Sequence, residues 1–217
     1  MAFWGVASTG EYRERFPEAS WIPGNDLPRA VVLGYPLLSG VLNTLVDQPT
    51  HIYFHHYRQV NFWLDRLALT IGQALEDAGF QAVAVAASQT LDDEDRIAHL
   101  SHRHLAFLAG LGWRGKNNLL VNRQRGSRFR LVSVLTDAPL EPGTALESEG
   151  CGSCTLCARS CPAGAIGETA RQFDLDKCAG VIDKFRRIQR IGQRICGVCQ
   201  KACIKYGWPR NQTGEVR

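Results

Sequence analysis

Cysteine is the residue type of this chain best suited to chemistry, and its eight copies all lie between residues 151 and 203. The run over residues 151–162 reads C-x₂-C-x₂-C-x₃-C-P, a ligand spacing of [4Fe–4S] clusters. Three thiolates two residues apart on a tight turn can reach three corners of one cubane, while the fourth points to a neighbouring cluster. A second cluster therefore needs three more cysteines, and the first cluster still needs one.

The rest of the chain supplies the four missing cysteines as Cys178 and a C-x₂-C-x₃-C run over residues 196–203. The crossed pattern then uses every cysteine, with none left over. The first cysteine set, predicted to hold one [4Fe–4S] cluster, comprises Cys151, Cys154, Cys157 and Cys203. The second cysteine set, predicted to hold the other cluster, comprises Cys161, Cys178, Cys196 and Cys199. One departure is that Ile204 follows the last cysteine, where proline is usual.

Two other uses of the cysteines compete with clusters. Structural zinc would use two C-x₂-C pairs, but it leaves the register of the longer run unexplained. Disulfides need an oxidising compartment, and residues 1–6 lack the basic start and apolar core of a signal peptide. The longest apolar stretch, residues 30–42, contains Gly34 and Pro36 and is too short to cross a bilayer. We therefore expect a cytoplasmic protein with no membrane partner.

The formal net charge of +4 would suit a nucleic-acid partner, but clusters change this sum. Each oxidised cubane with four thiolates carries a charge of about −2, so two clusters bring the protein close to neutrality. Basic side chains concentrate near the C-terminus. They either offset the clusters from a solvated helix face or bind a phosphate-bearing partner such as RNA. These residues are Lys184, Arg186, Arg187, Arg190, Arg194, Lys201, Lys205 and Arg210.

Hydrophobic periodicity outlines the elements that must position the cysteines. Apolar residues at helical spacing predict helices over residues 53–79 and 97–109. Short apolar runs predict strands over residues 27–35, 81–86, 119–122 and 129–135. The last two strands are expected to form a hairpin that turns at Gly126.

The remaining upstream residues carry weaker signals. Residues 1–26 are expected to be irregular apart from a short helix around residues 11–16, and residues 138–150 have the composition of a linker. Beyond the linker, Cys178 shares a helix face with Leu175, Val181, Ile182 and Phe185, as expected for a cysteine that faces a buried cluster. We predict two domains, over residues 1–145 and 146–217.

A glycine-rich loop over residues 110–118 separates the second predicted helix from the hairpin. Its glycines would let the backbone approach a flat macrocycle or a phosphate, and its lysine and asparagines add charge and amide groups. The alternative is a tight turn that caps the preceding helix. The predicted cofactor-binding residues are Gly112, Trp113, Gly115, Lys116, Asn117 and Asn118.

Two residues upstream of this loop are candidates for proton transfer. His102 lies about two helical turns before the loop, and Asp95 lies in the acidic segment before the helix. The alternatives are a packed histidine and a solvated acidic loop. We predict that a cofactor lies between residues 112–118 and the first cysteine run, with His102 directed toward the same cleft.

Residues 109–137 contain A-G-L-G-W-R-G-K-N-N-L-L-V from residue 109, Gly126-Ser127, and L-T-D-A-P-L from residue 135. With these motifs the segment resembles the epoxyqueuosine reductase family, which is akin to corrinoid-dependent reductive dehalogenases. The first cysteine run with the following P-A-G-A-I, and I-C-G-V-C from residue 195, extend it over roughly residues 95–205.

The resemblance implies an α+β protein with two domains. The first domain resembles nitroreductases and a cobalamin-processing chaperone, and the second is a ferredoxin-like domain with two clusters. It implies a reductase in which two [4Fe–4S] clusters deliver electrons to cobalamin, or alternatively to FMN. The implied substrate is a small molecule or a modified nucleoside, and the implied electron donor is a ferredoxin or flavodoxin.

The chain also departs from the family pattern. The family's enzyme is longer and grips tRNA with a C-terminal repeat region, whereas this sequence ends at Arg217, so tRNA is a weaker candidate partner. The family's proton-donating acid aligns with Arg96, and Asp95 is its neighbour. Two further functions stay open: an electron-transfer protein that reduces a partner enzyme, and a nucleic-acid-binding protein with structural clusters.

Overall fold

The computed structural model describes residues 2–19, 27–89, 91, 98–147, 150–188 and 191–204. The chain divides into two compact units, and each is built from segments that are separate in the sequence. The sheet unit comprises residues 1–35, 59–112 and 130–147. The cysteine unit comprises residues 36–58, 113–129 and 148–217. Two upstream segments, residues 36–58 and 113–129, thus group with the cysteines, whereas the sequence-based division is a single cut after residue 145.

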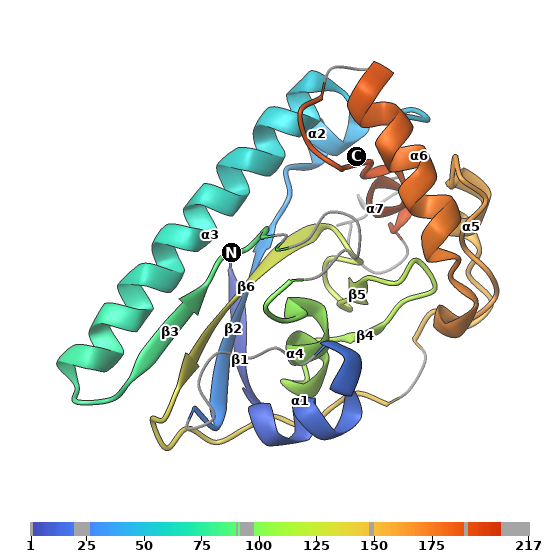
Figure 1. The fold of residues 1–217 in the computed structure, drawn as a ribbon. Helices are drawn as coiled ribbons and strands as arrows, with labels where there is room; N and C mark the ends of the chain where they lie inside the picture. Colours follow the sequence, from blue (N-terminus) through green and yellow to red (C-terminus); the bar gives the residue numbers. More distant parts are fainter. Residues whose placement is uncertain are drawn as a thin grey trace, which may run out of the picture. The chain divides into compact units, whose positions relative to one another are not determined.

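A four-stranded sheet forms the centre of the sheet unit (Figure 1). Its strand order is β1 (Phe3–Ser8), β2 (Arg29–Pro36), β6 (Phe129–Thr136) and β3 (Ala82–Val85). β1 pairs antiparallel with β2, with Phe3 opposite Gly34, and β3 pairs antiparallel with β6, with Ala82 opposite Thr136. The Phe3 ring lies over Gly34, where a Cβ atom would be 2.2 Å from the ring. This glycine therefore makes room for the aromatic ring at the start of β1.

Helices cover both faces of this sheet, as Figure 1 shows. A Cβ atom on Gly5 would lie 3.0 Å from the Ala109 carbonyl oxygen, so this face of β1 meets the end of α4 (His102–Leu108). On the other face, the Tyr35 ring packs edge-on against Trp63 of α3 (His51–Asp77). The alternation of side chains along the strands thus separates the two helical layers.

The long helix α3 follows the sequence prediction closely. Val60, Leu64 and Ala68, four residues apart, are all buried. The Thr50 hydroxyl accepts a hydrogen bond from the Tyr53 backbone N–H at the start of the helix, and Gly79, with φ of 88°, follows its end. The helix predicted over residues 53–79 is confirmed, with observed bounds that lie two residues earlier.

Two predictions about strands are wrong. Residues 1–26 are not an irregular entry, because residues 3–8 form β1. The predicted hairpin does not form either: β6 lies between β2 and β3, whereas β5 (Leu120–Val121) pairs with β4 (Trp113–Arg114). The physical reason is that β6 forms its ladder with β3, which is distant in sequence, and most of its side chains on both faces are buried in the sheet unit. Only a bridge between Asn122 and Gly126 remains of the turn.

The second predicted helix is shorter than expected. It was predicted over residues 97–109, and α4 spans His102–Leu108. Residues 98–101 are described and lie outside any helix, whereas residue 97 and Asp95 lie outside the described residues. In the sheet unit, helix α1 (Thr9–Arg15) contacts both β1 and α4. It confirms the short helix predicted around residues 11–16, although it starts and ends earlier in the sequence.

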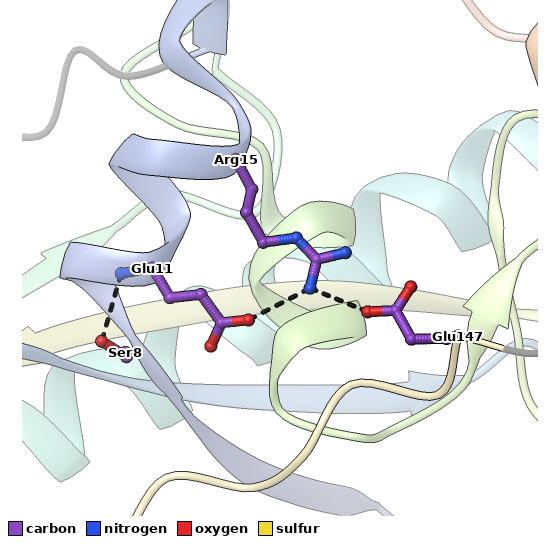
Figure 2. A network of polar contacts seen from close by, with 4 residues as sticks. All are labelled: Ser8, Glu11, Arg15 and Glu147. Atoms are coloured by element: carbon purple, nitrogen blue, oxygen red, sulfur yellow. Dashed lines mark hydrogen bonds and ion pairs between the residues drawn. The ribbon is translucent and has the colours of Figure 1, made fainter.

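A polar network joins the end of the predicted linker to α1, as Figure 2 shows. Arg15 bridges two carboxylates, with its Nη1 atom 3.1 Å from Glu11 and 2.9 Å from Glu147. The Ser8 hydroxyl caps α1 by accepting a hydrogen bond of 3.3 Å from the Glu11 backbone N–H. All four residues belong to the sheet unit.

The cysteine unit contains the first residues of α3, the 14-residue helix α6 (Leu175–Ile188) and several short elements. The short elements are α2 (Ser39–Asn43), the β4–β5 pair, α5 (Leu156–Ser160) and α7 (Val198–Ala202). Two 3₁₀ turns complete the described elements, η1 (Pro17–Ala19) in the sheet unit and η2 (Ala170–Gln172) in the cysteine unit. Among the helices in the described ranges, none combines the length and the apolar character needed to cross a membrane.

Side-chain hydrogen bonds hold α7 in place within the cysteine unit. The Arg128 guanidinium donates to the backbone carbonyls of Gln200 and Lys201 at the end of the helix. The Gln200 amide donates to the carbonyl of Ser127 at 2.9 Å and accepts a hydrogen bond from the Tyr53 hydroxyl, also at 2.9 Å. These bonds satisfy carbonyl groups that a helix end leaves without partners, so they fix the position of the cysteines on either side of α7.

Candidate metal centre

The four thiols of the first cysteine set line one hollow in the cysteine unit. Its other lining residues are Lys116, Asn117, Val121 and Leu156. The hollow holds about 360 Å³ of empty space, part of which is open solvent. Cys203, far from the other three in sequence, thus joins them in space, as the crossed pattern predicts.

Local backbone geometry brings these thiols together. Cys151 and Cys154 lie on a turn in which the Cys154 N–H donates to the Cys151 carbonyl at 3.0 Å, and Gly152 within it has a φ of 49°. Cys203 follows α7 and packs on Gly126, whose φ is 59°. A Cβ atom on Gly126 would lie 2.1 Å from the Cys203 carbonyl oxygen and 3.0 Å from its sulfur. Gly126 is therefore a site residue, although the sequence analysis gave it only as a hairpin turn and as part of the family resemblance.

Ionisation of the first cysteine set is unfavourable without a cationic group. Burial, and to a lesser extent negative charge on Cys203, Cys151 and Cys154, together raise the pKa of the Cys157 thiol to about 11. Burial also raises the pKa of Cys203, while hydrogen bonds from Ser127 act in the opposite direction. Four neighbouring thiolates become stable here when a metal group supplies positive charge, because coordination deprotonates thiols outright.

The thiols of the second cysteine set also influence one another's pKa. Burial, and to a lesser extent negative charge on Cys178 and Cys161, raise the pKa of Cys196 to about 11. Burial raises the pKa of Cys199 well above its usual value, and the same two cysteines add to this shift. Negative charge on Cys157 also raises it, so the two sets are neighbours. Gly197, with φ of 81°, lets the turn before α7 pack on Tyr53.

The spacing of the thiols bears on the size of the group they could hold. In the described ranges, no three His, Cys, Asp or Glu side chains are arranged to hold one metal ion. A tetrahedral zinc ion needs ligand sulfurs about 2.3 Å from one point, whereas a cubane presents four separate irons to its thiolates. Four thiols around one hollow match the ligand number of either group.

Residues 113–118 of the glycine-rich loop belong to the cysteine unit, and two of their side chains contact the first cysteine run. Trp113 is buried, and its Nε1–H donates to the Cys151 sulfur at 3.4 Å. Lys116 is buried as well, and its Nζ donates to the carbonyls of Gly152 at 2.7 Å and Cys154 at 3.1 Å. The side chains predicted to bind an organic cofactor are thus engaged with the cysteine loops.

The other residues of this loop shape its backbone. A Cβ atom on Gly115 would lie 2.4 Å from a Val121 methyl group, so this glycine allows close packing against β5. Asn118 has a φ of 58°, a left-handed conformation that asparagine tolerates better than most residues. Gly112 is buried. Direct contact of these residues with an organic cofactor stays a prediction.

His102 occupies a position that favours a structural role. Its Nε2 lies 2.9 Å from the Ala86 carbonyl and its Nδ1 lies 2.9 Å from the Ser133 hydroxyl. Since a carbonyl only accepts, Nε2 carries the proton and Nδ1 accepts from Ser133. Burial lowers the pKa of His102 to about 4, the Ala86 carbonyl opposes this and the Arg130 guanidinium adds to it. The ring is therefore neutral near pH 7, and both nitrogens are occupied.

This geometry favours the packed-histidine alternative over a proton donor. His102 joins the start of α4 to β6 and to the end of β3 within the sheet unit. Asp95, the other candidate for proton transfer, lies outside the described residues.

Comparison with known proteins confirms the resemblance to the epoxyqueuosine reductase family. No family model matches the sequence. An epoxyqueuosine reductase from Aliivibrio fischeri is 31% identical over 199 residues, which cover 83% of this chain and 48% of that protein. One from Escherichia coli strain K12 is 49% identical over 117 residues, which cover 49% of this chain and 30% of that protein. The chain thus spans about half the length, or less, of these relatives.

Solved structures share the fold. The structure of a reductive dehalogenase, described with a mechanism for B12-dependent dehalogenation, superposes with a TM-score of 0.70 at 19% identity. The match covers 93% of this chain and 29% of the dehalogenase chain. An epoxyqueuosine reductase with an epoxyqueuosine-modified tRNA-Tyr stem loop gives 0.57 at 18% identity, covering 99% and 65%. The mixed α/β architecture is therefore that of reductive dehalogenases and epoxyqueuosine reductases.

Proposed function

We propose that this chain, whose sequence resembles epoxyqueuosine reductases, is an iron–sulfur oxidoreductase with two [4Fe–4S] clusters. The observation that carries the proposal is the convergence of Cys203 with Cys151, Cys154 and Cys157 on one hollow. The second set supplies the other four ligands, Cys161, Cys178, Cys196 and Cys199. When bound, such clusters supply one-electron transfer at potentials set by their surroundings.

The residues of the cysteine unit fit this group. The four thiols of the first set line one hollow, and the buried Lys116 side chain lies in the same lining. Its positive charge offsets part of the negative charge that four thiolates and a cluster bring. A cubane with four cysteine ligands has no open iron site, so reduction of a substrate requires a second centre.

We propose cobalamin for that second centre, with FMN as the alternative. This proposal is supported by the fold that the chain shares with a reductive dehalogenase for which a B12-dependent mechanism is described. Lys116 and Asn117, predicted to bind the cofactor, are already engaged with the cysteine loops and with Ser127, so no side chain of the loop is assigned to the corrin. The proposed domains are a nitroreductase-like domain over residues 1–145 and a ferredoxin-like domain over residues 146–217.

The proposed substrate is a small molecule or a modified nucleoside, and the proposed electron donor is a ferredoxin or flavodoxin. A relative of known structure binds a modified tRNA stem loop, which makes tRNA a candidate. In this chain, Lys184, Arg186 and Arg187 are exposed on α6 and could contact a phosphate backbone. An electron-transfer protein without a substrate of its own is the competing function.

Cofactor binding separates the enzyme from the electron carrier. Anaerobically reconstituted protein is incubated with cobalamin, with FMN or with neither, then passed through a gel-filtration column and examined by visible spectroscopy. The proposal expects one cofactor to co-elute with the protein at a fixed ratio. Retention of neither cofactor by protein that carries both clusters would favour the carrier.

Nucleic-acid binding is tested separately. We expect weak binding of tRNA that falls steeply with salt and weakens further when Arg186 and Arg187 are changed to glutamate. A tight complex selective for tRNA at physiological salt would contradict this and favour epoxyqueuosine chemistry.

A further inference from the structure

Two short helices of the cysteine unit each carry cysteines of both predicted sets. Cys157 lies within α5 and belongs to the first set, whereas Cys161 follows the last residue of this helix and belongs to the second. In α7 the order is reversed: Cys199 lies within the helix and belongs to the second set, and Cys203 follows it and belongs to the first. The two helices contact each other. A displacement of either helix would therefore move ligands of both clusters at once.

The two helices differ at matched positions. When they are aligned on their internal cysteines, Gln200 of α7 corresponds to Ala158 of α5. Alanine has no polar side-chain atom, so α5 cannot form a side-chain hydrogen bond from this position. The Ser160 hydroxyl of α5 donates within its own helix, to the Cys157 carbonyl at 3.2 Å. Gln200, in contrast, is buried and forms hydrogen bonds with residues outside its helix.

The Gln200 amide is oriented by contacts at both of its ends. Its Nε2 donates to the Ser127 carbonyl at 2.9 Å and to the Phe129 carbonyl at 3.3 Å. Because carbonyl oxygens only accept, these two contacts fix which end of the amide is the nitrogen. Its Oε1 accepts a hydrogen bond of 2.9 Å from the Tyr53 hydroxyl. The amide thus links α7 to two segments of the cysteine unit that precede the cysteines in sequence.

Tyr53 contacts the last cysteine run at a second point. This residue lies near the start of α3 and is buried, with 2% of its surface exposed. A Cβ atom on Gly197 would lie 2.4 Å from the Tyr53 ring, so the ring packs on the turn between Cys196 and Cys199. The ring and the hydroxyl of Tyr53 therefore hold adjacent parts of the same segment, through Gly197 and Gln200.

Further hydrogen bonds fix the end of α7. The Lys201 side chain donates from Nζ to the Leu45 carbonyl, and the Arg128 guanidinium donates to two carbonyls of the helix. A helix of five residues is not stable by itself in water, so such side-chain bonds determine where it lies. Gln200 is at the middle of α7, between these bonds and the Gly197 contact.

We propose that Gln200, oriented by Tyr53, is a positioning residue for both clusters, because it fixes a helix that holds one ligand of each. Side-chain contacts that orient metal ligands contribute to metal affinity without touching the metal. This inference rests on the proposed function, because it requires both clusters to be present.

Lys116 provides a comparison within the same unit. Its ammonium donates to the carbonyls of Gly152 and Cys154, in a turn whose two cysteines, Cys151 and Cys154, both belong to the first set. Loss of this side chain should therefore loosen one cluster, whereas loss of the Gln200 amide should loosen both.

The test follows the two clusters of the full reconstituted protein during incubation with an iron chelator. Samples are withdrawn, reduced and frozen for electron paramagnetic resonance, and the spectra of Cys203→Ala and Cys178→Ala identify the signals of the second and the first cluster. Tyr53→Phe removes only the hydroxyl and is expected to speed the loss of both signals by the same factor, about fivefold for one hydrogen bond. Gln200→Met removes the amide at similar side-chain length and should speed both losses by a larger factor.

Two variants serve as controls. Lys116→Met is expected to speed the loss of the first signal and leave that of the second at the wild-type rate. Ser160→Ala should leave both rates unchanged, because the bond that it removes stays within α5. A general loosening of the unit would instead speed both losses in Lys116→Met as well.

Faster loss of one signal alone in Gln200→Met would overturn the inference, as would wild-type rates in both Gln200→Met and Tyr53→Phe. Equal acceleration of both losses by Lys116→Met would overturn it too, and each of these results leaves the proposed function standing. A wild-type chain that takes up no iron would overturn both. Should Gln200→Met fail to load fully, its iron content decides: we expect both signals to be reduced together, and one intact signal would contradict a role in positioning both clusters.

Discussion

The sheet unit and the cysteine unit are stabilised by different interactions. In the sheet unit, four strands pair in one sheet and most side chains of β6 are buried. In the cysteine unit, α5 and α7 have five residues each and β4 and β5 have two. Helices this short are not stable by themselves in water. The cysteine unit must therefore obtain its order from side-chain links and, by our proposal, from its clusters.

The buried polar side chains show the same difference. In the sheet unit, His102 joins segments that hydrogen-bonded strands and packed helices already hold near one another. In the cysteine unit, Lys116 binds a carbonyl of the turn that carries Cys151 and Cys154, whereas Asn117 and Gln200 of α7 both bind Ser127. The proposed chemistry therefore lies in the unit whose short helices and strands contribute least to its own stability. Metal binding should be coupled to the folding of this unit.

Iron removal should give the largest contrast between the units. Chelation under reducing conditions is expected to abolish protection of α5 and α7 against hydrogen exchange, because buried thiolates then repel one another or must be protonated. Protection of β6 and α3 beyond residue 59 should persist. Mass spectrometry of exchanged peptides measures both in one sample. Equal loss of protection in the two units would show that they do not differ in this way.

Acid should weaken the sheet unit through His102. The pKa of about 4 in the folded chain lies below the usual 6.5, so between these pH values the unfolded chain binds a proton that the folded chain does not. Stability therefore falls as the pH drops below 6.5, by roughly 2 kcal/mol at pH 5.

The acid effect is measured as hydrogen exchange of β6 peptides at pH 7 and pH 5, corrected for intrinsic rates. The control is His102→Gln, which does not titrate, so the part of the pH dependence due to His102 should disappear in it. A variant that retains the full pH dependence would exclude His102 as its source. If His102 is instead a proton donor, the variant should slow turnover while its pH dependence of stability stays that of the wild type.

The ion pair between Arg15 and Glu147 should have the smallest effect. Its side chains are 34% and 68% exposed, and exposed pairs contribute about 0–1 kcal/mol. Glu147→Gln is therefore expected to lower the stability of the sheet unit by less than about 1 kcal/mol, and this difference should shrink at high salt. Denaturant unfolding compares it with Glu141→Gln, an exposed change in the same segment. A loss well above that limit would mean that Figure 2 shows a structural anchor.

What the sequence could predict follows the same division. The helix around Leu64 was predictable because its apolar residues recur at helical spacing over many turns. β1 was not, because its pairing depends on Gly34, where the Phe3 ring packs, and this contact is distant in sequence. The partners of β6 were missed because a strand buried on both faces gives no alternating pattern.

The site shows a similar limit. Cysteine spacing was enough to group Cys203 with Cys151, and the structure brings both to one hollow. The orientation of Lys116 and Asn117 could not be predicted, because a glycine-rich loop gives no periodic signal for which way its side chains point. Ser127 follows Gly126 in the resemblance to epoxyqueuosine reductases, which was the one signal that could have drawn attention to it.

Iron content of single cysteine variants tests the two-set arrangement most directly. The wild type is expected to bind about eight iron and eight sulfide per chain, and Cys203→Ala and Cys178→Ala about four iron each. Their electron paramagnetic resonance spectra should differ, since each retains the cluster that the other loses, and together they should account for the wild-type spectrum. About four iron in the wild type, zinc in place of iron, or the same residual spectrum in both variants would contradict the assignment of two separate cysteine sets.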